Sequence, residues 1–300
     1  MSENNDKTSL GVIIGILAFF LLVFIFSVGA VYSLLADETM PQNAIGVIEI
    51  KGPIESADQT IHDIQAFTDN DEIQAMLIRI DSPGGSVSAS QELVEAIQTI
   101  HKPVVISMGN MAASGGYYVA CAGPKIYANP GTLTGSIGVI SQILEFKDLM
   151  EFLMIRVHTV KTGTLKDAGS PFREFSETDK AYFTAMGIEI LDQFVEHVAK
   201  ARNLPKEKIQ QLADGRVWTG REAKNLGLID EIGGMNAAIA ALKKEANLKG
   251  KYTLVYPTKD TNALLNSLLT EGASEIFDGF RASAQKASQQ QESFQYLYQR

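Results

Sequence analysis

A serine within a run of small residues is the strongest chemical signal in this sequence. Residues 111–118 are Met-Ala-Ala-Ser-Gly-Gly-Tyr-Tyr, and they follow directly on the apolar run 103–108. This order predicts a strand that turns into a helix with Ser114 at its first turn. Free backbone N–H groups and the helix dipole favour an anion there, so Ser114 is a candidate nucleophile for acyl transfer. A tight turn that packs a strand on a helix accounts for these residues equally well.

A serine hydroxyl needs a base to take its proton. The four histidines all stand in ordinary helical, turn or strand contexts, which leaves a serine–histidine–aspartate triad without support; they are His62, His101, His158 and His197. A lysine can serve if burial lowers its pKa from ~10.4 to about 7. Spacing alone does not choose among the candidates Lys102, Lys125, Lys147, Lys161, Lys166 and Lys180. Lys166 lies in a glycine-bounded loop that can reach a cleft, although a surface charge is its ordinary interpretation.

The amino-terminal region has the pattern of a membrane anchor. Residues 10–35 contain no charged residue and exceed the ~20 residues that a transmembrane helix needs. The apolar stretch is longer than that of a cleaved signal peptide, which favours an uncleaved signal anchor. Lys7 precedes it, and Asp37 and Glu38 follow it. This charge bias predicts a cytoplasmic segment at 1–9 and a large domain on the other side of the membrane.

Beyond a linker at 36–43, apolar strands alternate with amphipathic helices. The strands at 45–50, 76–80 and 104–108 are apolar almost throughout, which predicts parallel strands covered by helices on both faces. The longest soluble helix is expected over 177–203, with Ser176 as its cap. Further helices are expected at 54–69, 93–100, 144–153, 205–212, 222–226 and 235–246, extended segments at 125–128, 157–161 and 252–256, and turns at 130–138.

Composition excludes several function classes. A net charge of -9, a pI near 5.0 and the lack of any Lys/Arg-rich stretch argue against nucleic acid. Cys121 is the only cysteine, so the chain has neither an intrachain disulfide nor a thiolate metal cluster. Nothing in the sequence has metal-ligand spacing, and no phosphate-cradling loop is present. We therefore expect no cofactor and no metal.

Five motifs occur together and in order. They are Asp81-Ser-Pro-Gly-Gly85, the 111–118 segment, Leu133-Thr-Gly-Ser-Ile-Gly-Val139, Lys161-Thr-Gly-Thr-Leu-Lys-Asp167 and Asp214-Gly-Arg-Val-Trp-Thr-Gly220. The set resembles the short, single-repeat signal peptide peptidases, bacterial membrane-bound serine proteases of peptidase family S49 in the Clp/crotonase superfamily. The resemblance implies an α/β fold with a Clp/crotonase-like core of repeated β-β-α units, preceded by one transmembrane helix. It places the peptidase domain at 44–260 and a helical or flexible extension at 261–300.

The resemblance also assigns roles to individual residues. The family's nucleophile falls on Ser114, its general base on Lys166, and the serine that orients the lysine on Ser136. The oxyanion hole of Clp-type sites falls on the backbone N–H groups of Gly85 and Gly115. For the acidic neighbours Asp167 and Asp214, loop salt bridges are the ordinary interpretation, and the 214–220 motif is expected to be structural.

At the level of the whole protein, the resemblance implies a Ser-Lys dyad endopeptidase of the bacterial inner membrane. It implies a dome-like octameric ring whose sites are shared between protomers. The substrates implied are remnant signal peptides and other unfolded apolar segments. A crotonase-like acyl-CoA enzyme is one alternative, disfavoured by the anchor, the acidic charge and the lack of a basic patch for CoA phosphates. A non-catalytic membrane scaffold with the same fold is another.

Overall fold

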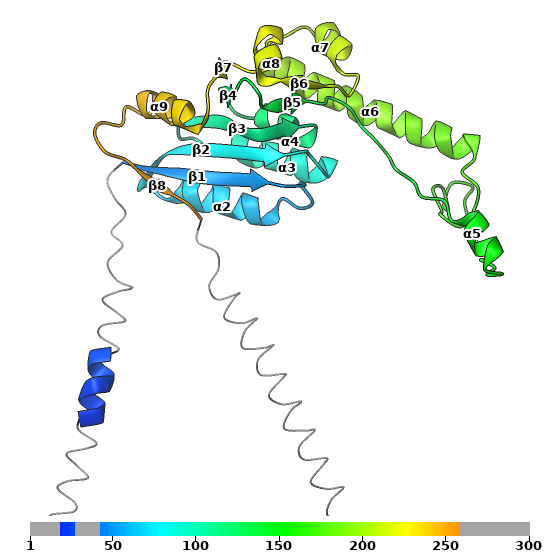
Figure 1. Ribbon diagram of the computed structural model, residues 1–300, viewed down its shortest axis with the longest axis horizontal. Helices are drawn as coiled ribbons and strands as arrows, with labels where there is room; N and C mark the ends of the chain where they lie inside the picture. Colours follow the sequence, from blue (N-terminus) through cyan, green and yellow to red (C-terminus); the bar gives the residue numbers. More distant parts are fainter. Residues whose placement is uncertain (1–18, 28–42, 258–300) are drawn as a thin grey trace, which may run out of the picture. The chain divides into compact units, whose positions relative to one another are not determined.

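The computed structural model describes residues 19–27 and 43–257 (Figure 1). Residues 19–27 are helical, and no helix within these two ranges is long and apolar enough to cross a bilayer. The rest of the predicted anchor, 10–18 and 28–35, lies outside the described residues, as do the segments 1–9, 36–42 and 261–300. The chain divides after Leu254, and only 255–257 of the second unit are described.

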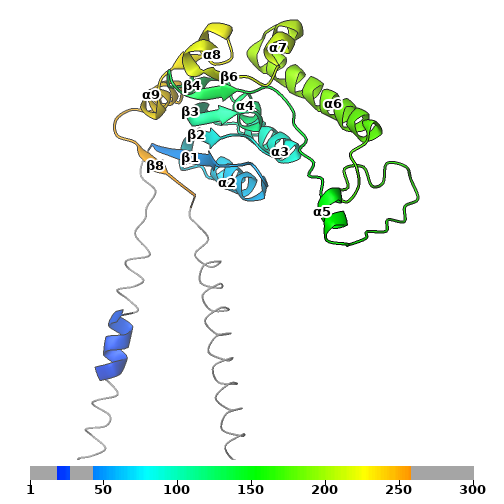
Figure 2. The same cartoon turned by 45° about the vertical axis from the view of Figure 1, so that its right-hand side comes forward.

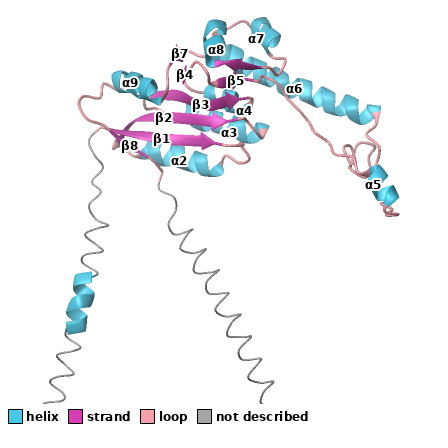
Figure 3. Cartoon of the chain, in the orientation of Figure 1, coloured by secondary structure: helices cyan, strands magenta, loops and turns pink. Residues whose placement is uncertain are grey.

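One mixed sheet forms the centre of the first unit (Figure 3). Its strands are β1 (Ala44–Lys51), β2 (Ile73–Ser82), β3 (Val104–Ala113), β4 (Ile126–Ala128), β5 (Leu133–Gly135), β6 (Val217–Thr219), β7 (Glu231–Ile232) and β8 (Thr253–Val255). They are ordered β6-β5-β3-β2-β1-β8, and β4 pairs with β3 and β7. The predicted parallel pairing of the three apolar strands is confirmed in β1–β2 and β2–β3. The antiparallel β5–β6 pair arises from segments in which the sequence predicted no strand.

Helices cover both faces of this sheet, as its apolar strands predict. They are α2 (Asp58–Asp69), α3 (Val87–Gln98), α4 (Gly115–Ala120), α5 (Lys147–Phe152), α6 (Glu177–Arg202), α7 (Lys206–Leu212), α8 (Gly220–Leu226) and α9 (Met235–Glu245). On one face, Ile45 and Val47 pack in a buried cluster with Leu242 of α9. On the other, Phe67 of α2 lies over Gly46, where a Cβ atom would approach its ring to 2.6 Å. Alternate residues of β1 therefore contact helices on opposite faces.

The long helix α6 begins as predicted. Ser176 accepts from the Asp179 backbone N–H and Asp179 accepts from the Ser176 N–H, which makes a capping box. The helix ends at Arg202, where Asn203 adopts the left-handed conformation that closes many helices.

A long connection, which we call the arm (residues 139–175), leads from the end of β5 to α6. Its centre is α5, a shorter helix than the predicted 144–153, and the predicted extended segment 157–161 pairs with no strand in the described part of the chain. Figures 1 and 2 both show α5 away from the sheet. Two hydrogen bonds connect the part of the arm before α5 with the part after it. The Phe146 N–H donates to the Pro171 carbonyl, and the Phe175 N–H donates to the Glu145 carboxylate.

Candidate active site

Ser114 occupies a strained turn between β3 and α4. It is the N-cap of α4, with φ 52° and ψ -124°. A side chain rarely adopts such a positive φ, and strain of this kind is found where surrounding structure holds a functional residue in place. The Ser114 N–H donates to the Gly135 carbonyl (2.8 Å) and its carbonyl accepts from Tyr118 N–H (2.9 Å). A serine on a sharp strand-to-helix turn is the geometry of a nucleophile elbow.

Two glycine N–H groups lie beside this serine. A Cβ atom on Gly84 would stand 2.6 Å from the Gly115 nitrogen, and one on Gly115 would stand 3.2 Å from the Gly85 nitrogen. The loop that holds Gly84 and Gly85 therefore touches the first residue of α4, and a side chain at either contact would separate them. Within the described residues neither the Gly85 nor the Gly115 N–H donates a hydrogen bond. Both predicted oxyanion donors are thus free and adjacent.

The pairing of β5 with β3 brings Ser136 close to Ser114. Gly135 pairs with Ala113 at the end of the β3–β5 ladder, so Ser136 follows the residue whose carbonyl accepts from Ser114. Ser136 also has a positive φ, of 50°. Its N–H donates to the Arg216 carbonyl (2.8 Å), and its hydroxyl donates to the Gly215 carbonyl (3.2 Å). The hydroxyl oxygen accepts no hydrogen bond from the described residues, so its lone pairs can accept from a further donor.

These residues line a single cavity of about 500 Å³. Ser114, Gly115, Ser136 and Gly85 are on its wall, and most of the remaining wall is apolar. Those other lining residues include Pro83, Val87, Tyr118, Ile140, Ile190, Leu191 and Phe194. The cavity could therefore hold an extended, apolar segment with its carbonyl group near Ser114.

Lys166 is not part of this cavity. It lies in the arm, exposed, in a turn closed by its own N–H donating to the Gly163 carbonyl (3.2 Å). No lysine or histidine of the described residues lines the Ser114 cavity. The structure thus brings four of the five predicted site residues together in one chain and leaves the predicted base apart.

Several of the other candidate lysines have partners elsewhere. Lys102 donates to the Phe67 and Asn70 carbonyls, and Lys161 donates to the Thr164 carbonyl and the Asp167 carboxylate. Lys125 lies over the Tyr127 ring, and Lys180 is 3.9 Å from Glu177. The expected loop salt bridges are also present, since Asp167 pairs with Lys161 and Arg173, and Asp214 pairs with Arg216.

His197 lies behind the cavity wall without facing the serine. Its ring packs on that of Tyr118, with 4.1 Å between centroids, and its Nε2 is 2.9 Å from the Tyr118 carbonyl oxygen. Burial lowers the pKa of His197, and burial also raises the pKa of the Cys121 thiol to about 12. His197 is unavailable as a base for Ser114 because its ring is held on Tyr118 and does not line the cavity. The Cys121 thiol stays protonated near neutral pH and is no thiolate nucleophile.

Helix α6 closes one side of the cavity, which no pattern in the sequence indicates. Gln193 and Phe194 reach it from a helix far along the chain, and Gln193 accepts a hydrogen bond from Gln91 of α3 (3.0 Å). Helical spacing could have identified Tyr118 as a lining residue, because a residue four positions after Ser114 lies on the same face of the helix.

Together the fold and the site define a mixed α/β protein with the geometry of an acyl-transfer centre. Residues 96–249 match the model of Peptidase family S49, and residues 43–134 match that of Clp protease. The chain belongs to peptidase family S49, as its motifs predict.

Three known proteins similar to this chain are named as proteases or peptidases. A Synechocystis protein, provisionally named a protease, is 38% identical over 65% of this chain and 72% of its own length. The chloroplastic serine protease SPPA of Arabidopsis thaliana is 35% identical over 77% of this chain. An Enterococcus faecium protein, provisionally named signal peptide peptidase SppA, is 34% identical over 73% of it. The chain spans 36% of the length of the Arabidopsis protein and 64% of that of the Enterococcus protein.

Proposed function

We propose that this protein is a serine endopeptidase that uses a Ser114–Lys166 dyad. The observation that carries the proposal is the strained turn of Ser114, held beside two free glycine N–H groups on an apolar cavity. A peptide carbonyl placed there meets the nucleophile and the oxyanion donors at once. Membership in a peptidase family supplies the class of reaction.

The chemistry follows from these groups. Neutral Lys166 takes the proton of the Ser114 hydroxyl, and Oγ attacks the peptide carbonyl carbon. The developing oxyanion accepts from the Gly85 and Gly115 N–H groups. The lysine ammonium then gives its proton to the leaving amine as the peptide C–N bond breaks. The same lysine next takes a proton from water, whose oxygen attacks the acyl carbon, and returns that proton to Ser114 Oγ as the ester bond breaks. The Ser136 hydroxyl accepts a hydrogen bond from the lysine Nζ, which directs the lone pair of the lysine amine toward Ser114.

The lysine in this proposal comes from a neighbouring copy of the chain. Two features support this: Lys166 is exposed on the arm, and the wall of the Ser114 cavity includes no lysine among the described residues. Insertion of Lys166 into a partner's apolar cavity would desolvate its amine and lower its pKa, as a general base at neutral pH requires.

The arm also has the surface of an interface. Its exposed large apolar side chains are Ile140, Leu144, Phe146, Leu149, Phe152, Leu153, Met154, Ile155, Val157, Val160, Leu165 and Phe172. Soluble monomers rarely expose a contiguous set of this kind. We take the arm to pack on neighbouring copies in a ring, in which each copy lends its lysine to the next.

Substrates and location are part of the same proposal. The apolar cavity suits unfolded apolar peptides, among them signal peptide remnants at a membrane. The uncharged stretch 10–35 anchors the protein in the bacterial inner membrane, with residues 1–9 cytoplasmic and the peptidase domain on the opposite side. Retention of the full chain in carbonate-washed membranes, and release of a chain that lacks 1–35, is the expected result.

The dyad is tested with single substitutions in the full chain. We expect Ser114→Ala and Lys166→Ala each to lower cleavage of an apolar fluorogenic peptide by at least ~10³-fold, because residues that act as one unit lose nearly all function singly. The matched controls are Ser88→Ala on α3 and Lys200→Ala on α6, neither of which lines the Ser114 cavity. Both controls are expected to retain activity.

Mixing the two inactive variants tests the shared site. Partial recovery of activity in mixed assemblies is expected, because one copy then supplies serine and the other lysine. No recovery in assemblies shown to be mixed would mean that sites close within one chain. Full activity of Ser114→Ala together with retention on CoA resin would favour the crotonase-like alternative. A wild type that does not cleave the peptide would favour the non-catalytic scaffold.

A further inference from the structure

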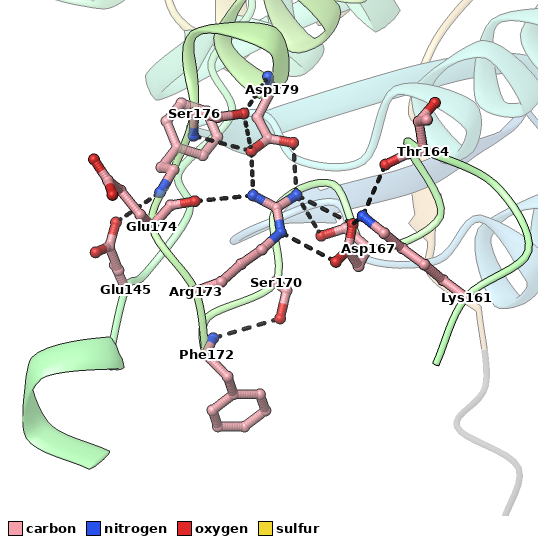
Figure 4. Close-up of polar contacts among 11 residues, drawn as sticks. Glu145, Lys161, Thr164, Asp167, Ser170, Phe172, Arg173, Glu174, Ser176 and Asp179 are labelled. Carbon is pink, nitrogen blue, oxygen red and sulfur yellow. Dashed lines mark hydrogen bonds and ion pairs between the residues drawn. The ribbon is translucent and has the colours of Figure 1, made fainter. Parts of the chain in front are cut away.

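A half-buried arginine joins the arm to the start of α6. The Arg173 guanidinium lies between two carboxylates, those of Asp167 and Asp179 (Figure 4). Its Nη2 donates to Asp179 Oδ1 (2.8 Å) and to the Asp167 carbonyl (2.9 Å), and its Nε is 3.2 Å from Asp167 Oδ2. Arginine is the side chain suited to this task, because its planar fork can hold two acceptors on different edges at once.

The Asp179 end of this cluster is rigid. The Asp179 side chain is only 2% exposed, and it belongs to the capping box of α6. Ser176 donates to the Asp179 carboxylate through both its hydroxyl (2.8 Å) and its backbone N–H (3.0 Å). Arg173 is therefore anchored to the first turn of the longest helix in the domain.

The Asp167 end holds the backbone next to Lys166. Lys161 closes the opposite side of the Asp167 carboxylate (2.6 Å) and donates to the Thr164 carbonyl (3.0 Å). Three consecutive turns fill the segment, since the N–H groups of residues 166, 168 and 170 donate to the carbonyls of residues 163, 165 and 167. We call Lys161, Asp167, Arg173, Ser176 and Asp179 the arginine clasp. Lys166 is exposed, while the residue after it is fixed on both sides.

We propose that Arg173 is a positioning residue for catalysis, which acts through Asp167 to hold Lys166 in the orientation that a neighbouring copy requires. This inference rests on the proposed function, in which Lys166 is the general base. A base must come within hydrogen-bond reach of the serine proton, and an ångström of misplacement can cost about 10²-fold in rate. A long lysine side chain on an unsupported loop would lose that precision. The clasp supplies a fixed Cα position, because it ties the loop to α6 and to Lys161.

The primary test compares Arg173 variants in the full-length assembled protein. Arg173→Ala is expected to lower kcat about 100-fold with KM within about twofold, because Arg173 does not line the Ser114 cavity. Arg173→Lys is expected to be intermediate, since an ammonium does not reproduce the two-edged fork. Amide hydrogen exchange over 163–170 is expected to quicken in Arg173→Ala. Arg221→Ala, a substitution of an exposed arginine outside the arm, is the matched control and should leave kcat and exchange unchanged.

A second experiment shows which copy of the chain needs Arg173. In mixed assemblies, a chain with Ser114→Ala supplies only the lysine, and a chain with Lys166→Ala supplies only the serine. Adding Arg173→Ala to the lysine-supplying chain should lower the recovered activity about 100-fold, whereas adding it to the serine-supplying chain should not.

Three results would overturn the inference: a wild-type kcat in Arg173→Ala, an equal loss on both sides of the mixture, or a loss of kcat that follows dissociation of the assembly. Failure of the proposed function is distinguishable from these. It would appear as full activity in Lys166→Ala. If recovery is lacking because sites close within one chain, the kcat and exchange of Arg173→Ala decide the question alone.

Discussion

Ser114 shows how backbone strain and chemistry coincide at a single residue. Its φ of 52° costs of order 1–3 kcal/mol for a residue with a side chain. The turn persists because strand β5 fixes its N–H and α4 fixes its carbonyl. Ser114 is part of the cavity wall, next to the Gly85 and Gly115 N–H donors. The strained conformation is thus held by hydrogen bonds on both sides of the residue.

Because of this strain, the residue at position 114 should affect the free energy of unfolding as well as activity. Ser114→Gly should unfold at a higher urea concentration than Ser114→Ala, by about 1 kcal/mol in the free energy of unfolding, since glycine adopts a positive φ without strain. Both variants should be inactive. Equal stability of the two would show that the turn is not strained.

His197 makes the stability of the domain depend on pH. Burial holds its pKa below the ordinary 6.5, so the folded state keeps the ring neutral. As pH falls through ~6.5 the unfolded chain takes up a proton that the folded protein does not, and stability is lost until the folded pKa is reached. His197→Gln, which keeps an N–H donor for the Tyr118 carbonyl, should remove this step. The test is the free energy of unfolding at pH 7.5, 6.5 and 5.5; an unchanged loss in the variant would assign the step to another group.

At the scale of elements, close approach between segments positions the oxyanion donors. The loop that follows β2 pairs with Ile54 at Gly85, and a Cβ atom on Gly85 would lie 2.2 Å from the Ile54 carbonyl oxygen. Its backbone must therefore move if any side chain is added. The same loop touches Gly115, so this movement would reach the site.

Gly85→Ala should consequently lower kcat by about 10²–10³, the usual cost of one oxyanion donor. Gly187→Ala is the matched control, because a Cβ atom there meets nothing within 4 Å. As Gly187 is inside α6, alanine should raise stability by about 0.5–1 kcal/mol and leave kcat unchanged. Circular dichroism and peptide cleavage measure both effects. Wild-type kcat in Gly85→Ala would exclude Gly85 as a donor.

At the scale of the whole molecule, the arm exposes large apolar side chains to solvent. The side chains of Phe152, Met154 and Val160 are 82%, 89% and 99% exposed. Transfer of such groups from water favours association by about 25 cal/mol for each Å² buried, before the entropic cost of association is subtracted. An active site that takes its base from a neighbour would depend directly on that association.

Phe152→Asp combined with Val160→Asp should therefore dissociate the assembly and abolish peptidase activity together. Sedimentation velocity and peptide cleavage on the same samples measure the two outcomes. Tyr252→Asp, a substitution of an exposed aromatic residue outside the arm, should change neither. Full activity in a monomeric double variant would contradict the shared site.

Prediction from sequence succeeded where the signal was local. The three apolar strands, the capped start of α6 and the turn at Ser114 each depend on the residues within a few positions of one another. The short strands β5, β6 and β7 were missed, whereas β4 and β8, which have three residues each, were predicted from their β-branched and aromatic residues. The missed strands form through their neighbours in the sheet, and their own periodicity is too short to detect.

The sequence by itself determined the strand–helix alternation, the membership in peptidase family S49 and the residue types available for chemistry. Only the tertiary structure decided that α6 closes the cavity, that Ser136 joins Ser114 through the β3–β5 ladder, and that Lys166 stands apart from both. It also showed Arg173 between Asp167 and Asp179. The physical reason is that these relations depend on packing and hydrogen bonds between residues distant in the chain, which leave no periodic trace in the sequence.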